Sequence, residues 1–275
     1  MRALTYFAVG LFFSSVPTTL LSAPAITATS TIVAASATAS TTPIASFMVT
    51  PASAATGTAH PSKVRSVKAQ YDVYMGNVKV ATMKEVFTRT QDTYHAESVS
   101  RAVGLLAMFK PETIHATSMG TITAQGLRPH TFIQSRKLDT NRNTRADFNW
   151  ADQTIRLSDK KGVRTVPLPA GTQDRLSAMY QFLYISTLNT PALTFNMTNG
   201  SRVGDYVYQI TPNQNVTTPL GTFKALYLHN PPKEHATRTE IWLVPEYANF
   251  PYKMNIIEAD GREFSQVLTH LKITP

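Results

Sequence analysis

The chain has 275 residues, a formal net charge of +9 and no cysteine. Its length is sufficient for one large domain that buries its own hydrophobic core. The lack of cysteine excludes structural disulfides, thiolate nucleophiles, iron–sulfur clusters and cysteine-ligated zinc, and it also excludes a membrane anchor through an acylated cysteine.

The first 25 residues have the features of a secretory signal peptide. Met1-Arg2 is a short positive start, an apolar run follows over residues 3–16, and Ala23-Pro24-Ala25 matches an Ala-x-Ala cleavage site. The run is short for a membrane span. The sequence therefore predicts export to the periplasm, and an uncleaved leader that anchors the protein in the inner membrane is the alternative.

Residues 26–65 are dominated by Ala, Ser, Thr and Pro. Such a segment cannot bury enough apolar surface to compensate for the entropy lost on ordering. It is predicted to be a disordered tether that precedes a single folded domain over residues 66–275.

From residue 67 the pattern changes to the period of two that is typical of half-buried β-strands. Residues 67–75 alternate between apolar and polar side chains, and Gly76-Asn77 predicts the first hairpin turn. Residues 104–109 are apolar and fit a bulge, a short helical turn or an edge. Regularly spaced strands without intervening helices favour antiparallel pairing. Further strands are predicted at residues 78–88, 94–102, 112–118, 121–123, 131–137, 144–150, 154–158, 206–211, 222–229, 237–244, 253–259 and 263–273.

A helix is predicted over about residues 172–188, because apolar side chains recur there at steps of three and four residues. The segment is apolar on nearly all sides, so the helix is expected to be buried. Thr172 and Asp174 are predicted to cap its first turn. The expected fold is mainly β: a single domain in which a strongly curved antiparallel sheet, half-barrel or barrel-like, packs around this one buried helix.

Six motifs occur in a specific order. They are Gly120-Thr121-Ile122, Gly126-Leu127-Arg128-Pro129, Asp147-Phe148-Asn149-Trp150, Gly171-Thr172-Gln173-Asp174-Arg175-Leu176-Ser177, Trp242-Leu243-Val244-Pro245 and Phe250-Pro251-Tyr252-Lys253. Together they resemble the bacterial exported proteins of the DUF3108 family over about residues 67–273. Asn149 departs from the family pattern, which has an acidic residue between the two aromatic residues. The resemblance implies an envelope location and a β-rich domain, and it implies no particular activity.

No motif predicts a catalytic, cofactor-binding or metal site, and no cofactor is expected. The seven histidines lack metal-binding spacing, and the sequence contains neither a Gly-x-Ser-x-Gly elbow nor a phosphate-binding loop. A carboxylate-dependent hydrolase of an envelope polymer remains an alternative, because carboxylates distant in sequence can converge in a fold. The candidates for such a pair are Asp147, Asp174, Glu240 and Glu258.

Several aromatic residues are expected to face the buried helix. They form either an ordinary core or, if the space is incompletely filled, a pocket for an acyl chain. We therefore expect a non-catalytic binding or scaffold protein for a lipid or lipoprotein. A structural partner-binding module, marked by an exposed apolar patch, is another alternative. The pocket candidates are Phe132, Phe148, Trp150, Tyr180, Tyr184 and Trp242.

Two predicted hairpin tips are basic. In an exported protein such tips fit an anionic membrane surface, although solvated tips explain the same pattern. Nucleic acid is not an expected partner outside the cytoplasm. The basic residues are Arg136, Lys137, Arg142, Arg145, Lys160 and Lys161.

Overall fold

The computed structural model describes residues 63–185, 188, 190–231 and 237–275. The predicted signal peptide and nearly all of the predicted tether lie outside the described residues. None of the helices in the described part has both the length and the apolar character needed to cross a membrane.

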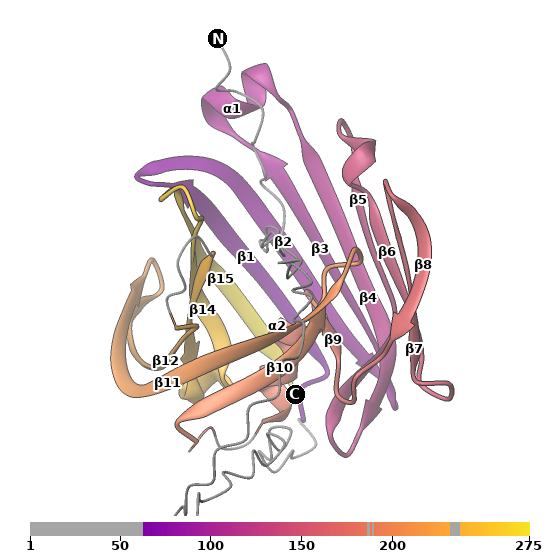
Figure 1. Ribbon diagram of the computed structural model, residues 1–275. Helices are drawn as coiled ribbons and strands as arrows, with labels where there is room; N and C mark the ends of the chain where they lie inside the picture. Colours follow the sequence, from indigo (N-terminus) through magenta and orange to yellow (C-terminus); the bar gives the residue numbers. More distant parts are fainter. Residues whose placement is uncertain (1–62, 186–187, 189, 232–236) are drawn as a thin grey trace, which may run out of the picture.

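The described residues form one curved sheet of 15 strands (Figure 1). The strands are β1 (Ser66–Met75), β2 (Val78–Thr90), β3 (Thr93–Ala102), β4 (Thr113–Thr123), β5 (Gly126–Arg136), β6 (Thr144–Asn149), β7 (Thr154–Asp159), β8 (Gly162–Pro167), β9 (Gln173–Asp174), β10 (Ala192–Thr198), β11 (Val203–Thr218), β12 (Gly221–His229), β13 (Arg238–Val244), β14 (Phe250–Ile257) and β15 (Glu263–Thr274). The helices are α1 (Gly104–Phe109) and α2 (Ser177–Gln181), with the 3-10 turns η1 (Thr140–Arg142), η2 (Phe182–Tyr184) and η3 (Pro245–Tyr247).

The sheet consists of two arms joined at β1. Strands β1 to β8 pair in sequence order and form the N-terminal arm, whereas β15 pairs with the other side of β1 and leads back through β14 to β9, forming the C-terminal arm. All neighbouring strands are antiparallel except β9 and β10, which are parallel. The expectation of a mainly β fold with a strongly curved antiparallel sheet is confirmed, and the sheet remains open.

One face of the sheet is apolar and lines the inside of the curve, as the period of two predicts. In β1, Val67, Ala69, Tyr71 and Val73 are buried, and the residues between them are more exposed. α2 packs against β5 of one arm and β14 of the other, so it lies between the arms (Figure 1). We call the buried face that surrounds α2 the inner wall.

The buried helix is present, but it is shorter than the predicted range of 172–188. Gln173 and Asp174 pair with Met197 and Thr198 as strand β9, so helix α2 begins only at Ser177. This strand pairing requires an extended backbone and overrides the local preference for helix. All residues of α2 and η2 are buried.

The two predicted caps behave differently. Asp174 Oδ1 accepts hydrogen bonds from the backbone N–H groups of Leu176 and Ser177, at 2.9 and 2.8 Å, and therefore satisfies the first turn of α2. The hydroxyl of Thr172 instead donates to the carbonyl oxygen of Pro169 at 2.7 Å. Thr172 is thus not a helix cap, because the helix begins too far from it.

Two other segments differ from the predicted pattern. Residues 126–129, which lie between the strands predicted at 121–123 and 131–137, begin strand β5, where Pro129 lies beside a register shift between Met119 and Gly120. Residues 104–109 form the short helix α1, which was one of three alternatives.

Gln181 attaches α2 to the turn between β4 and β5. Its side-chain oxygen accepts the N–H of Leu127 at 2.7 Å, and its amide nitrogen donates to the carbonyl of Gln125 at 2.9 Å. Gly126 has a φ of +101°, and a Cβ atom there would lie 2.5 Å from the Gln181 side chain. Glycine at this position therefore permits both the turn and the close approach of α2.

Candidate functional site on the inner wall

Four of the six predicted pocket residues are buried inside the domain. Phe132, Phe148, Tyr180 and Tyr184 are each at most 8% exposed. The ring of Tyr180 stacks on Phe87, with centroids 4.8 Å apart. These contacts are those of a packed core around α2.

The two tryptophans are only partly buried and lie at the margin of this core. Trp150 is half-buried, stacks on Phe148 at 5.8 Å and donates its indole N–H to the carbonyl of Pro129 at 2.6 Å. Trp242 lies on the outer face of β13, between the buried Ile241 and Leu243. The structure therefore does not bring Trp242 together with the other five aromatic residues. Successive side chains of a strand point to opposite faces, so Trp242 faces outward when its neighbours Ile241 and Leu243 face inward.

Asp174 is buried completely and bonded on both carboxylate oxygens. Besides its bonds to the start of α2, its Oδ2 accepts the hydroxyl of Ser118 on β4 at 2.6 Å, and Tyr94 lies 3.0 Å from the same hydroxyl. Burial raises the pKa of Asp174 to about 6, although these hydrogen bonds favour the charged form. The contacts give Asp174 a structural role that joins α2 to the N-terminal arm.

A second buried carboxyl group lies on β2. Glu85 points to the inner wall and accepts the hydroxyl of Tyr180 at 3.1 Å. Burial raises its pKa from 4.5 to about 7. No sequence motif points to Glu85. The alternation of β2 nevertheless indicates a buried carboxyl group, because Glu85 occupies an inward position between Met83 and Phe87.

Further along the inner wall, apolar side chains give way to polar ones. On β5 the inward positions are Phe132, Gln134 and Arg136, and Glu112 lies just before β4, beside the end of β5. Gln134, Arg136 and Glu112 are 4%, 5% and 7% exposed. We refer to these three residues as the polar cluster.

Several buried atoms of the polar cluster have no hydrogen-bond partner among the described residues. They are Gln134 Oε1, Glu112 Oε2, and Arg136 Nε and Nη1. Glu112 Oε1 accepts the backbone N–H of Leu138 at 3.0 Å, so only its second oxygen is unsatisfied. Buried polar groups are nearly always paired, and leaving one unpaired costs about 1 to 3 kcal/mol. A group of such atoms at one place indicates a site for water or a polar ligand.

Several arginine residues surround the polar cluster. Burial lowers the pKa of Arg136 to about 10, and the nearby charge of Arg142 acts in the same direction. Burial likewise lowers the pKa of Arg175 to about 9, with further lowering by Arg136, Arg142 and Arg202. Guanidinium groups from η1, β5 and the segment after β9 therefore lie within electrostatic reach of one another.

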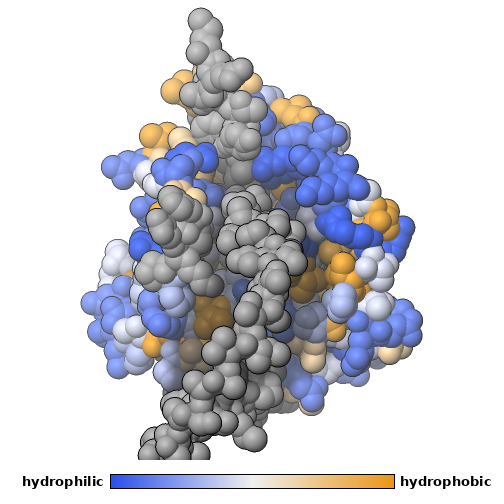
Figure 2. Space-filling model, in the orientation of Figure 1, coloured by the Kyte–Doolittle hydropathy of each residue, from blue (hydrophilic) through white to orange (hydrophobic). Residues whose placement is uncertain are grey.

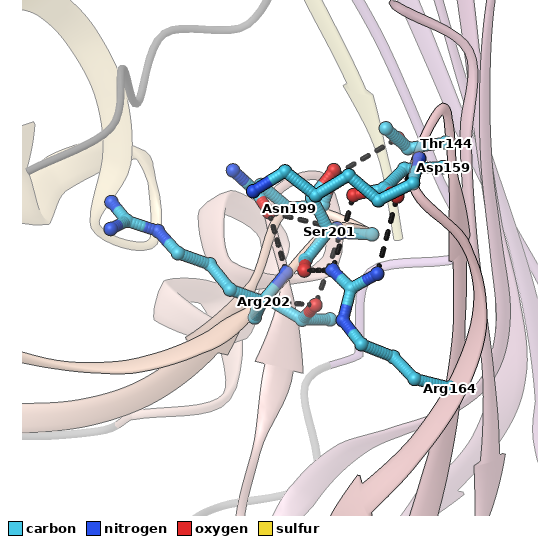
Figure 3. A network of polar contacts seen from close by, with 9 residues as sticks. Thr144, Asp159, Arg164, Asn199, Ser201 and Arg202 are labelled. Carbon is cyan, nitrogen blue, oxygen red and sulfur yellow. Dashed lines mark hydrogen bonds and ion pairs between the residues drawn. The ribbon is translucent and has the colours of Figure 1, made fainter. Parts of the chain in front are cut away.

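The two ends of the sheet meet next to this region (Figure 3). Thr144 on β6 donates its hydroxyl to the carbonyl of Asn199 at 3.0 Å. Arg164 on β8 pairs with Asp159 at 3.1 Å and also donates to the carbonyl of Ser201. The turn between β10 and β11 is thus attached to the N-terminal arm by side chains, without strand pairing, and it closes the inner wall beside Gln134, whose register partner is Thr144.

The predicted basic residues divide into two groups. Lys137, Lys160 and Lys161 are exposed and Arg142 is half-buried. Arg136 is instead buried on the inner wall, because it continues the inward alternation of β5. Arg145 lies on the outer face of β6, where two of its nitrogens bond the carboxylate of Asp147 at 2.6 to 2.9 Å.

The four carboxylates considered for hydrolysis do not meet in one site. Asp147 and Glu240 lie on the outer face, on β6 and β13, which are far apart in the sheet. Asp174 is buried beside α2, and Glu258 follows β14 and accepts the hydroxyl of Thr237 at 3.2 Å. Their placement provides no carboxylate pair of the kind that glycoside hydrolysis requires.

Comparison with known proteins agrees with this fold. The sequence matches the family DUF3108, a protein of unknown function, over residues 70–268. A crystal structure of a β-barrel-like protein of the domain of unknown function DUF1849 from Brucella abortus has a TM-score of 0.50 and 14% identity, covering 77% of this chain and 100% of that chain. No curated protein matches the sequence.

Two further solved structures are more distant. A predicted lipoprotein from Parabacteroides distasonis has a TM-score of 0.32 and 10% identity, covering 77% of this chain and 97% of that chain. A predicted exported protein with a YmcC-like fold from Bacteroides fragilis has a TM-score of 0.28 and 8% identity, covering 78% of this chain and 99% of that chain. The family match spans most of the sheet and confirms the resemblance seen in the motifs: the chain belongs to the DUF3108 family.

Proposed function

We propose that this protein is an exported, non-catalytic binding protein of the cell envelope, and that it holds an amphipathic ligand, such as a lipid or lipoprotein, at its inner wall. The observation that carries the proposal is the polar cluster. Its buried, unpaired atoms adjoin the apolar surface around α2. An amphipathic ligand needs both kinds of surface side by side.

The register of the N-terminal arm places the two surfaces in neighbouring rows. Phe87, Ala96, Ser118, Phe132 and Ala146 are consecutive partners across five strands, and all are buried. The next inward row contains Glu85, Ser98 and Gln134 in register with Ala116. The first row is covered by α2 and the segment before it, so the polar end of a ligand would lie beside the second row, where polar atoms are unpaired.

The location is part of the proposal. The predicted signal peptide, the family implied by the motifs and the basic net charge support the periplasm, where a basic protein can reach anionic lipid headgroups. An uncleaved leader would keep the same domain on the outer side of the inner membrane.

The test is ligand recovery from the exported protein. Protein purified from a periplasmic extract, without detergent, is extracted with organic solvent and analysed by mass spectrometry. We expect one class of amphiphile at a near-stoichiometric amount. Gln134→Leu, which removes a polar atom from the inner wall, should lower the recovered amount, whereas Ser135→Leu on the outer face of the same strand should not. Protein that is consistently empty, and that takes up no lipid from liposomes, would overturn the proposal.

A second candidate function is docking on an anionic membrane, and α1 favours it. Leu105, Met108 and Phe109 are 73%, 77% and 83% exposed, and the cations Arg101 and Lys110 flank them. Figure 2 shows apolar surface at the end of the molecule where Figure 1 places α1. An exposed apolar tip with a basic surround matches the interface of a bilayer that contains anionic lipids.

The antiparallel register places the other basic tips at the same end. The turns from β3 to β4, from β5 to β6 and from β7 to β8 are alternate connections of one meander, so they share one end of the N-terminal arm. These turns carry α1, Lys137 with Arg142, and Lys160 with Lys161. A ligand held at the inner wall would then be delivered to, or taken from, the membrane through this end.

A further inference from the structure

The arginine residues next to the polar cluster come from separate parts of the chain. Arg136 ends β5 and Arg142 belongs to η1, which is held against β5 because Asn143 Oδ1 accepts the backbone N–H of Arg136 at 2.7 Å. Arg175 follows β9. Arg202 lies in the turn between β10 and β11, and its side chain points away from Arg164 (Figure 3). We refer to these four residues as the arginine cluster.

Charged groups of both signs act on the arginine cluster. Glu112 and Asp139 favour the charged form of Arg136, whereas the influences on Arg175 include three other arginines and the phenol of Tyr206. A phosphate monoester carries a charge of about −1.5 to −2 near neutral pH, and its oxygens accept charge-assisted hydrogen bonds from guanidinium groups.

Arg136 shows where an anion would bind. The residue is 5% exposed, and among the described residues it makes no ion pair and its buried Nε and Nη1 atoms have no hydrogen-bond acceptor. A desolvated guanidinium group with free N–H donors is among the strongest sites that proteins offer to phosphate oxygens. Gln134 and Glu112 are buried beside it on the same wall.

We propose that the arginine cluster binds the phosphate group of the ligand, with Arg136 as the central contact. The inference rests on the proposed function, since the phosphate is the polar end of the amphipathic molecule held at the inner wall. The ligand class is therefore a lipid that carries a phosphate group. Free inorganic phosphate presents the same chemistry to the cluster without an apolar chain.

Isothermal titration calorimetry at pH 7.5 with three soluble probes tests this. The probes are inorganic phosphate, dihexanoyl phosphatidic acid and dihexanoylglycerol. We expect phosphatidic acid to bind more tightly than phosphate, and dihexanoylglycerol to bind most weakly. Arg136→Met should weaken the binding of both phosphate-containing probes about tenfold or more, as for the loss of a charge-assisted hydrogen bond.

Two further variants control this result. Arg142→Gln changes a half-buried residue in η1 and should weaken the same two probes even if Arg136→Met disturbs the core. Arg156→Gln removes the same charge from the outer face of β7 and should leave all affinities unchanged. Thermal unfolding of each variant establishes that it is folded.

The outcomes separate this inference from the proposed function. If dihexanoylglycerol binds as tightly as phosphatidic acid and the arginine variants change nothing, the inner wall binds lipids and the arginine cluster is not a phosphate site. If phosphate binds through Arg136 and Arg142 but the acyl chains add no affinity, the phosphate site stands and the amphipathic ligand is wrong. If no probe binds, both proposals fail.

Discussion

The buried carboxyl group of Glu85 should make the stability of this protein depend on pH. Burial raises its pKa from 4.5 to about 7. The folded state therefore holds this proton more tightly than the unfolded state, so the stabilisation is fully present below about pH 4.5 and is lost as the pH rises through 7. The difference between the two pKa values corresponds to about 3 kcal/mol in the free energy of unfolding.

Glu85→Gln isolates this effect, because glutamine does not titrate and keeps an oxygen that can accept the hydroxyl of Tyr180. Urea unfolding at pH 5 and pH 8 measures the free energy of unfolding of both proteins. We expect the wild type to lose about 2 kcal/mol more than the variant between these two pH values.

The other buried carboxyl group provides the internal reference. Asp174, with its pKa raised by burial to about 6, is present in both proteins and also favours the folded state at the lower pH. Both proteins should therefore retain some loss of stability between pH 5 and pH 8. If Glu85→Gln has the same pH dependence as the wild type, Glu85 does not hold its proton in the folded state, and its burial on the inner wall does not raise its pKa.

Three further results are expected. Asp174→Ala should lower the free energy of unfolding by about 2 kcal/mol or more, because two N–H groups and a hydroxyl lose their acceptor. Asp174→Asn should lower it by less, and urea titrations at pH 7 measure both variants. Gly120→Ala should cost about 3 kcal/mol in the same assay, because a Cβ atom there would lie 2.2 Å from the carbonyl oxygen of Arg128, and a cost below 1 kcal/mol would contradict this packing. Replacing Leu105 and Phe109 by Ser should abolish cosedimentation with phosphatidylglycerol liposomes and change stability by less than about 0.5 kcal/mol; unchanged sedimentation would exclude α1 as the membrane contact.

The structure also explains why the family motifs contain glycine. Gly120 and Gly126 lie on either side of the turn between β4 and β5, where Pro129 and the Gln181 side chain approach the backbone closely. A side chain at either position would push away β5 or α2. These glycines thus help to set the distance between the N-terminal arm and the helix inside it.

Among the functional residues, the sequence identified those whose type was informative by itself. Asp174 was recognised as a cap, and the basic residues of the hairpin tips were recognised as a group. Gln134 and Glu112 were missed. A polar residue at an inward strand position is visible in the alternation of β5, yet its lack of a partner depends on neighbours from β4, η1 and the segment after β9.

The amino-acid sequence alone determined the antiparallel β-fold, the buried segment around residue 180 and the family. These features follow from periodicity and from short motifs, which are local properties of the chain. Only the tertiary structure decided that Gln173 and Asp174 form a strand, that Trp242 faces outward and that Arg136 faces inward. An alternating pattern shows which residues share a face of a strand, but pairing between distant segments decides how far the sheet curves and which face becomes its inside.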